Sequence, residues 1–113
     1  AFYCRRSGHK LDYAVSGPAE AAAILRAKWE MGLAGGVLIA NPIPEEYGLD
    51  FDEMEGVIQK ALAAADEAGV HGKDITPFLL AKVKDLTGGE SLASNIQLAL
   101  NNARCAAQIA AAM

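Results

Sequence analysis

The chain has 113 residues, of which 52% are hydrophobic and 21% charged, with a formal net charge of -4. This length suits one modest domain with a single core. The acidic net charge and the lack of a clustered basic patch argue against a nucleic-acid-binding function. Since no apolar stretch reaches the roughly 20 residues of a membrane helix, we expect neither a nucleic-acid nor a membrane partner.

The two cysteines and two histidines do not form a recognisable metal or disulfide pattern. Cys4 and Cys105 lie at opposite ends of the chain, and His9 and His71 stand alone. Such spacing fits neither a zinc site nor a disulfide framework. We therefore predict a reducing compartment, the cytoplasm, and no metal site built from these residues.

The start of the chain has no feature of a natural N-terminus. Residue 1 is alanine, and the opening AFYCRRSG contains no helix cap and no signal-peptide pattern. We interpret this start as a cut within a longer chain or as the start of the second chain of a processed one.

The first predicted helix lies in SGPAEAAAILRAKWEMGLAGG. Pro18 suits a first helical turn, Glu20 lies near the positive end of the helix dipole, and Gly35 and Gly36 end the pattern. The apolar positions recur at helical spacing and predict one buried face: Ala22, Leu25, Trp29 and Leu33.

A short apolar run, VLIA at residues 37–40, follows the glycines and precedes NPIP. Its length and branched side chains predict a strand buried on both faces, as in a sheet covered by helices. Asn41 comes directly after this strand, at the end where open α/β sheets bind ligands. Because Asn before Pro is also an ordinary turn starter, Asn41 is either a turn residue or a site residue.

Two helices follow in the second half of the chain. The segment DEMEGVIQKALAAADEAGVHG predicts a helix capped by Asp52 together with Glu55 and ended by Gly69. A third helix is predicted to begin with Thr76 as cap and Pro77 at the first position. The inner face of the earlier helix is predicted to comprise Met54, Val57, Ile58, Ala61 and Leu62.

The last predicted helix, from Ser91 as cap to the end, has one charged residue, Arg104. Five polar residues fall on one strip that could face water: Ser94, Gln97, Asn101, Arg104 and Gln108. Asn95 and Asn102 fall elsewhere, with apolar residues on both sides, so we expect much of the helix, including Leu100, to be buried. A buried amide without a partner costs about 1 to 3 kcal/mol. The side chains of Asn95 and Asn102 therefore need hydrogen-bond partners, which could be backbone groups, ordered water or a ligand.

One strand cannot make a sheet, and two are marginal alone. The sequence therefore predicts an α/β fold in which this mostly helical segment contributes one or two short strands, the second from AFYC, to a sheet formed by other residues.

Three motifs carry a family resemblance: AFYCRRSG, GGVLIANPIPEE and GKDITPFLLAKVKDLTGGESLASNIQLALNNARCAAQIA. Together they resemble the C-terminal third of the pseudouridine-5'-phosphate glycosidase family, which includes indigoidine synthase A-like members. The resemblance implies that residues 1–113 are the C-terminal segment of one larger domain with an α/β/α layered fold, without an internal boundary.

The resemblance also implies an activity. Enzymes of this family reversibly split the C-C bond of pseudouridine 5'-phosphate into uracil and ribose 5-phosphate, act as homotrimers, and use a divalent metal, typically manganese. The implied mechanism holds the ring-opened sugar as a lysine Schiff base, with a glutamate as proton donor. Because a C-glycoside lacks a protonatable leaving oxygen, the imine is needed as electron sink.

The resemblance places the Schiff-base lysine, the glutamate and the metal-binding aspartate before Ala1, and none of the lysines of this chain matches them. Asn95, in SLASNI, matches an active-site asparagine of the family and is the predicted catalytic residue. Asn102, two turns later, is either a supporting substrate-site residue or a structural one. Cys4 stands where the resemblance suggests a hydroxyl residue. The segment alone is expected to be inactive.

Two other functions remain open. The apolar last helix could serve a non-catalytic helical interaction or oligomerisation module, with the amides fixing its register. The second alternative is a related enzyme that forms C-glycosidic bonds. Such an enzyme would share the fold but join the sugar to a different acceptor molecule.

Overall fold

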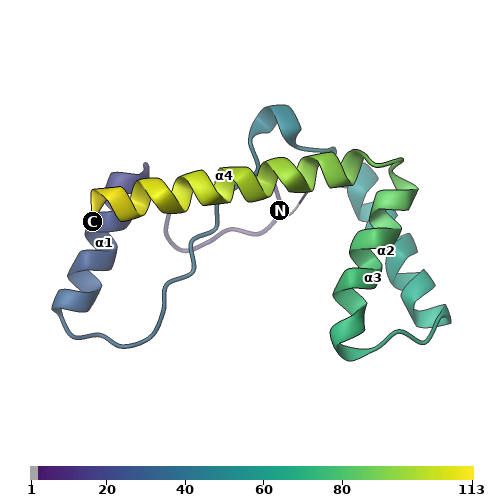
Figure 1. Cartoon of the computed structure of the whole chain (residues 1–113), viewed down its shortest axis with the longest axis horizontal. Coiled ribbons are helices and arrows are strands. Elements are labelled where there is room, and N and C mark those ends of the chain that lie inside the picture. Colours follow the sequence, from purple (N-terminus) through teal and green to yellow (C-terminus); the bar gives the residue numbers. More distant parts are fainter. Residues whose placement is uncertain (1–2) are drawn as a thin grey trace. The chain divides into compact units, whose positions relative to one another are not determined.

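A computed structural model describes residues 3–113 (Figure 1). The α-helices in this range are α1 (Pro18–Glu30), α2 (Phe51–Glu67), α3 (Ile75–Leu86) and α4 (Glu90–Ala112). Two short 3-10 helices, η1 (Glu45–Tyr47) and η2 (Gly72–Asp74), precede α2 and α3. The mostly helical character predicted from the sequence is confirmed.

The chain forms two compact units that both draw on α4. Unit 1 comprises Ala1–Ser7 and Pro42–Leu98, and unit 2 comprises Gly8–Asn41 and Ala99–Met113. The first half of α4 therefore belongs to unit 1 and the second half to unit 2.

In unit 1, α2 and α3 pack side by side as a helical hairpin (Figure 1). The buried core consists of Tyr3, Cys4, Met54, Ala61 and Val83. Tyr3 is also held by its main chain, because the Leu49 N–H donates a hydrogen bond to the Tyr3 carbonyl oxygen, at 2.8 Å. Met54 and Ala61 lie on the α2 face predicted from the sequence, whereas Leu62 is 41% exposed.

In unit 2, α1 packs against the end of α4. The buried contacts are Ala21, Ala22, Leu25 and Ile109. The Arg26 guanidinium donates hydrogen bonds to the last carbonyl oxygens of the chain, those of Ala112 at 3.1 Å and Met113 at 3.3 Å. A cation at the negative end of a helix stabilises that end. Trp29 and Leu33, predicted on the buried face of the first helix, are instead about half exposed.

The helix starts differ from the predictions. Asp50, rather than Asp52, caps α2, because its carboxylate accepts the Glu53 N–H at 2.9 Å. Thr76 lies inside α3, which continues directly from η2. Ser91 is also helical, and its N–H donates to the Thr87 hydroxyl oxygen at 3.1 Å. Each predicted cap was close to the start but too late in the chain, because the preceding residues already adopt helical or capping geometry.

The helix ends follow glycine chemistry more closely. Gly69 ends α2 as predicted, with φ +67°, and the Val70 N–H donates to the Ala65 carbonyl oxygen at 3.0 Å. This hydrogen bond, from an N–H to the carbonyl oxygen five residues earlier, closes a Schellman motif. Such a motif needs a residue in the left-handed backbone conformation. The same arrangement at Gly32 ends α1 at Glu30, earlier than the predicted stop at Gly35.

The strand predicted at residues 37–40 does not form within the described part of the chain. These residues have no regular secondary structure. Of the AFYC segment, residues 1 and 2 lie outside the described residues, and Tyr3 and Cys4 are not in a strand. A strand exists only when its main chain pairs with a neighbour, and no neighbour is present among residues 3–113.

One face of α4 is packed and the opposite face is open. Packed positions are Ser91, Ser94, Leu98 and Ile109, and exposed apolar positions are Leu92, Ile96 and Leu100. The expected burial of Leu100 was therefore wrong for this chain, since its side chain is 45% exposed. Ser94, assigned to a water-facing strip, is buried. None of the helices in residues 3–113 is long and apolar enough to cross a membrane.

Candidate functional site

Asn95, the predicted catalytic residue, lies in the second turn of α4 in unit 1. Its side chain is half-buried at the edge of the packed face, beside the buried Ser94. The Ser94 hydroxyl donates a hydrogen bond to the Tyr47 carbonyl oxygen at 2.8 Å and so fixes this turn of α4 to the loop after residue 42. The Asn95 amide therefore stands on a rigid backbone, which a positioned site residue needs.

Asn41 and Asn102 lie together in unit 2. The Asn41 Nδ2–H donates to Asn102 Oδ1 at 3.0 Å. Asn41 is half-buried and Asn102 is exposed. Asn102 is therefore not a buried amide, but it lies beside Ala106 and Ile109, among apolar neighbours as expected. The hydrogen-bond partner of the Asn102 amide is thus a second amide, that of Asn41, rather than backbone or water.

The amide pair borders a cavity of about 450 Å³ whose other lining residues are mainly apolar: Ile39, Cys105, Ala106, Ile109, Ala110 and Met113. After their mutual hydrogen bond, the two amides still have free donor and acceptor capacity. A small apolar cavity with a few polar groups is the usual character of a small-molecule site. This edge of unit 2 can therefore hold an uncharged heterocycle better than a phosphate.

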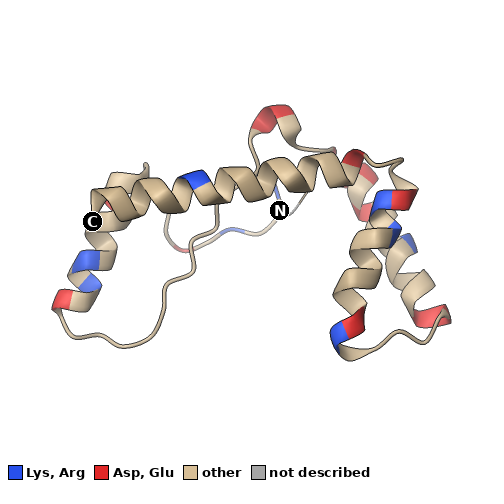
Figure 2. Ribbon diagram, in the orientation of Figure 1, with Lys and Arg blue, Asp and Glu red and all other residues tan. Residues whose placement is uncertain are grey.

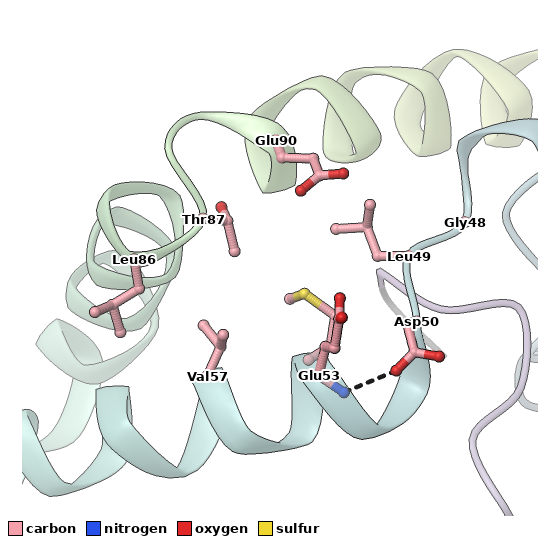
Figure 3. Close-up of a pocket in the computed structure, with 9 residues that line it drawn as sticks. Gly48, Leu49, Asp50, Glu53, Val57, Leu86, Thr87 and Glu90 are labelled. Atoms are coloured by element: carbon pink, nitrogen blue, oxygen red, sulfur yellow. Dashed lines mark hydrogen bonds between the residues drawn. The ribbon is translucent and has the colours of Figure 1, made fainter.

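A second cavity, of about 470 Å³ in unit 1, has an acidic rim (Figure 3). Asp50, Glu53 and Glu90 contribute carboxylates, and Leu49, Met54, Val57 and Leu86 contribute apolar side chains. Like charges repel a phosphate, and the lining includes no basic residue. This cavity is consequently unsuited to a sugar phosphate.

Charge is unevenly distributed over the helices (Figure 2). Both signs occur on α2 and α3, whereas α4 carries Glu90 in its first turn and Arg104 further along. The side of α4 that carries Asn95 thus offers amides and apolar groups rather than charge.

Lys28 is occupied structurally. Its ammonium group donates hydrogen bonds to the carbonyl oxygens of Leu33, Ala34 and Gly35, at 3.0, 2.8 and 3.2 Å. It therefore stabilises the turn after α1.

Cys4 is buried in the core of unit 1, where its S–H donates to the Asp50 carbonyl oxygen at 3.7 Å. Burial raises the pKa of the Cys4 thiol, and the carboxylates of Asp50 and Glu55 add to the rise. A neutral, buried thiol is inert. Cys4 thus has a packing role in this structure.

Ile109 lies beside the amide pair, among the apolar residues expected to flank Asn102, but sequence reasoning missed Ile39 and Cys105. A signal was present for Cys105, because a position three residues after Asn102 shares its side of a helix. No pattern indicated Ile39, since its place beside the cavity depends on the tertiary path of residues 37–40.

The sequence profile of the family described as "Indigoidine synthase A like protein" matches residues 1–112. The chain belongs to this family. The family resemblance expected from the sequence motifs is thereby confirmed.

Two curated relatives carry the name pseudouridine-5'-phosphate glycosidase. The one from Caldanaerobacter subterraneus is 56% identical over 97% of this chain and 36% of the relative. The one from Hahella chejuensis is 58% identical over 98% of this chain and 37% of the relative. The chain thus spans little more than a third of the length of these relatives.

A solved structure is also similar, that of the prealnumycin C-glycosynthase AlnA in complex with ribulose 5-phosphate. The TM-score is 0.83 at 29% sequence identity, over 99% of this chain and 37% of that one.

Proposed function

We propose that this chain is part of a pseudouridine-5'-phosphate glycosidase, which reversibly cleaves the C-C glycosidic bond to give uracil and ribose 5-phosphate. The observation that carries the proposal is the 56–58% identity, over nearly the whole chain, to relatives of that name. The chain forms one segment of a single α/β/α domain in a homotrimer, and residues outside it complete the domain.

The bond-breaking groups are supplied from outside this chain. A lysine forms the Schiff base that serves as electron sink, and a glutamate donates the proton to the departing base. Lys28 is engaged otherwise, because its ammonium group donates to three carbonyl oxygens in the turn after α1.

The family resemblance implies a divalent metal. Among residues 3–113 no three His, Cys, Asp or Glu side chains come together as metal ligands. These residues do not fit a resident metal, and the proposed manganese or similar ion is bound by residues outside the chain.

The role of Asn95 is to orient the substrate. An amide both donates and accepts hydrogen bonds without adding charge beside an iminium. The fixed turn of α4 supports this role, because the Ser94–Tyr47 hydrogen bond limits the movement of the amide. Asn41 and Asn102 act as a paired element that contacts the substrate.

The test uses a chimera in which this chain replaces the matching segment of the Caldanaerobacter relative, with uracil release from pseudouridine 5'-phosphate as the assay. Asn95→Ala should lower turnover at least tenfold, about 1.4 kcal/mol of transition-state stabilisation. Gln108→Ala, an exposed amide on the same helix, is the matched control and should keep full turnover. Normal turnover of Asn95→Ala would remove Asn95 from the site.

One observation favours a second function. The similarity to a C-glycosynthase in complex with ribulose 5-phosphate supports synthesis of a C-glycoside from another acceptor. A chimera that joins ribose 5-phosphate to a different acceptor but does not release uracil would select this alternative. A folded chimera without either activity would favour the helical interaction module.

A further inference from the structure

The Asn41–Asn102 amide pair is open rather than closed. Two carboxamides that face each other can exchange two hydrogen bonds, but here a single one forms, from Asn41 Nδ2–H to Asn102 Oδ1 at 3.0 Å. Within residues 3–113, neither side chain makes a further hydrogen bond. The Oδ1 atom of Asn41 and the Nδ2–H groups of Asn102 are therefore available to a ligand.

The cavity of about 450 Å³ beside the pair offers apolar contact without charge. Ile109 is buried and Cys105 is half-buried, and Ile39 lines the cavity with them. Among the described residues that line it, none has a charged side chain. A phosphate or a carboxylate would lose hydration there without meeting a counter-charge. The cavity therefore favours an uncharged ligand with apolar faces.

An acceptor and a donor on neighbouring side chains select a particular polar edge. The Asn41 oxygen needs an N–H from the ligand, and the Asn102 Nδ2–H needs a carbonyl oxygen. An imide ring carries both groups side by side, an N–H next to a C=O. Methylation of the imide nitrogen would leave the Asn41 oxygen unpaired, and an unpaired polar group in a site built to use it weakens binding.

We propose that the Asn41–Asn102 pair and the cavity beside it form a binding site for cyclic imides, which are recognised through their N–H and C=O edge. Uracil has this edge, since one of its N–H groups lies between two carbonyl groups. The site would then hold the base rather than the sugar phosphate. Only the choice of uracil as the natural ligand rests on the proposed function, whereas the imide chemistry rests on the amide pair and the cavity.

Cys105 provides a direct probe of occupancy, because it lines the cavity, whereas Cys4 is buried in unit 1. The experiment measures alkylation of both thiols of the 113-residue chain by iodoacetamide, using mass spectrometry. Succinimide is the ligand, and N-methylsuccinimide is the same ring without the N–H. Once succinimide fills most sites, alkylation of Cys105 should slow about fivefold or more, and that of Cys4 should not change. An unchanged Cys105 rate, or equal slowing by both compounds, overturns the proposal.

Substitution of either amide tests the pair itself. Asn41→Ala and Asn102→Ala should each remove the protection of Cys105 by succinimide. Gln108→Ala removes an exposed amide of α4 that does not line the cavity, and it should keep the protection. Circular dichroism checks that each variant has the helix content of the parent chain. Full protection in a folded Asn102→Ala chain would exclude the pair as the recognition element.

The Caldanaerobacter chimera extends the test to uracil. In the synthetic direction, Asn102→Ala should raise KM for uracil about tenfold, because a hydrogen bond to the base is lost. KM for ribose 5-phosphate should change less than about twofold, since the pair does not contact the sugar phosphate. Equal increases of the two KM values contradict recognition of the base.

The imide site and the glycosidase function can fail separately. If succinimide protects Cys105 but a folded chimera releases no uracil, the glycosidase function is refuted and the imide site stands. If the chimera releases uracil but succinimide does not protect Cys105, the imide site is refuted and the function stands.

Discussion

The contrast between Ile43 and Leu100 gives a direct test of where the chain is packed. Ile43→Ala and Leu100→Ala each remove three carbon atoms, but Ile43 is fully buried and Leu100 is 45% exposed. Because the same number of carbon atoms is removed, the difference in the free energy of unfolding reports mainly burial.

The magnitudes follow from the carbon atoms removed. Three buried carbons at about 0.8 kcal/mol each give roughly 2.4 kcal/mol for Ile43→Ala. The cavity left behind raises the range to about 2 to 5 kcal/mol. Leu100 loses only about half of the transfer contribution and leaves no closed cavity, so its substitution should cost roughly 1 kcal/mol.

The assay is urea unfolding of the 113-residue chain at 25 °C, followed by far-ultraviolet circular dichroism because the chain is helical. The urea midpoint should fall for Ile43→Ala by at least twice the shift seen for Leu100→Ala, with the slope m unchanged. Equal shifts, or a larger shift for Leu100→Ala, would refute the packing of α4 described above.

Three further predictions concern a helix cap, two thiols and a carboxylate. Asp50→Ala should lower stability by about 1 kcal/mol through loss of the α2 cap, whereas Asp52→Ala should cost no more than about half as much in the same urea assay; the reverse order would assign the cap to Asp52. Iodoacetamide at pH 8 should alkylate the half-exposed Cys105 at least tenfold faster than Cys4, which is buried and has a raised pKa; mass spectrometry with equal rates would contradict this. Hydrogen bonds to its carboxylate lower the pKa of Glu20, so its stabilising effect is present above its usual pKa and is lost as pH falls through the lowered pKa; Glu20→Gln should flatten this acid loss, and an unchanged pH profile would exclude it.

The sequence by itself determined the helices, their approximate ends and the family. Periodic apolar positions and glycines act over a few residues, so Gly69 could be identified as the end of α2 without any tertiary information. The caps were displaced by one to a few residues, because Asp50 and Asp52 offer the same side chain and only backbone geometry decides between them.

Tertiary structure alone decided which polar residues meet and which apolar residues are covered. The Asn41–Asn102 hydrogen bond joins residues 61 positions apart, and no local pattern encodes such a contact. The residues of VLIA show a strand pattern, yet a strand requires a neighbouring strand, and residues 3–113 contain none, so the segment has no regular structure here. Leu100 likewise has the sequence pattern of a core residue but is 45% exposed, since hydrophobicity favours burial and only tertiary packing decides which apolar residues are buried.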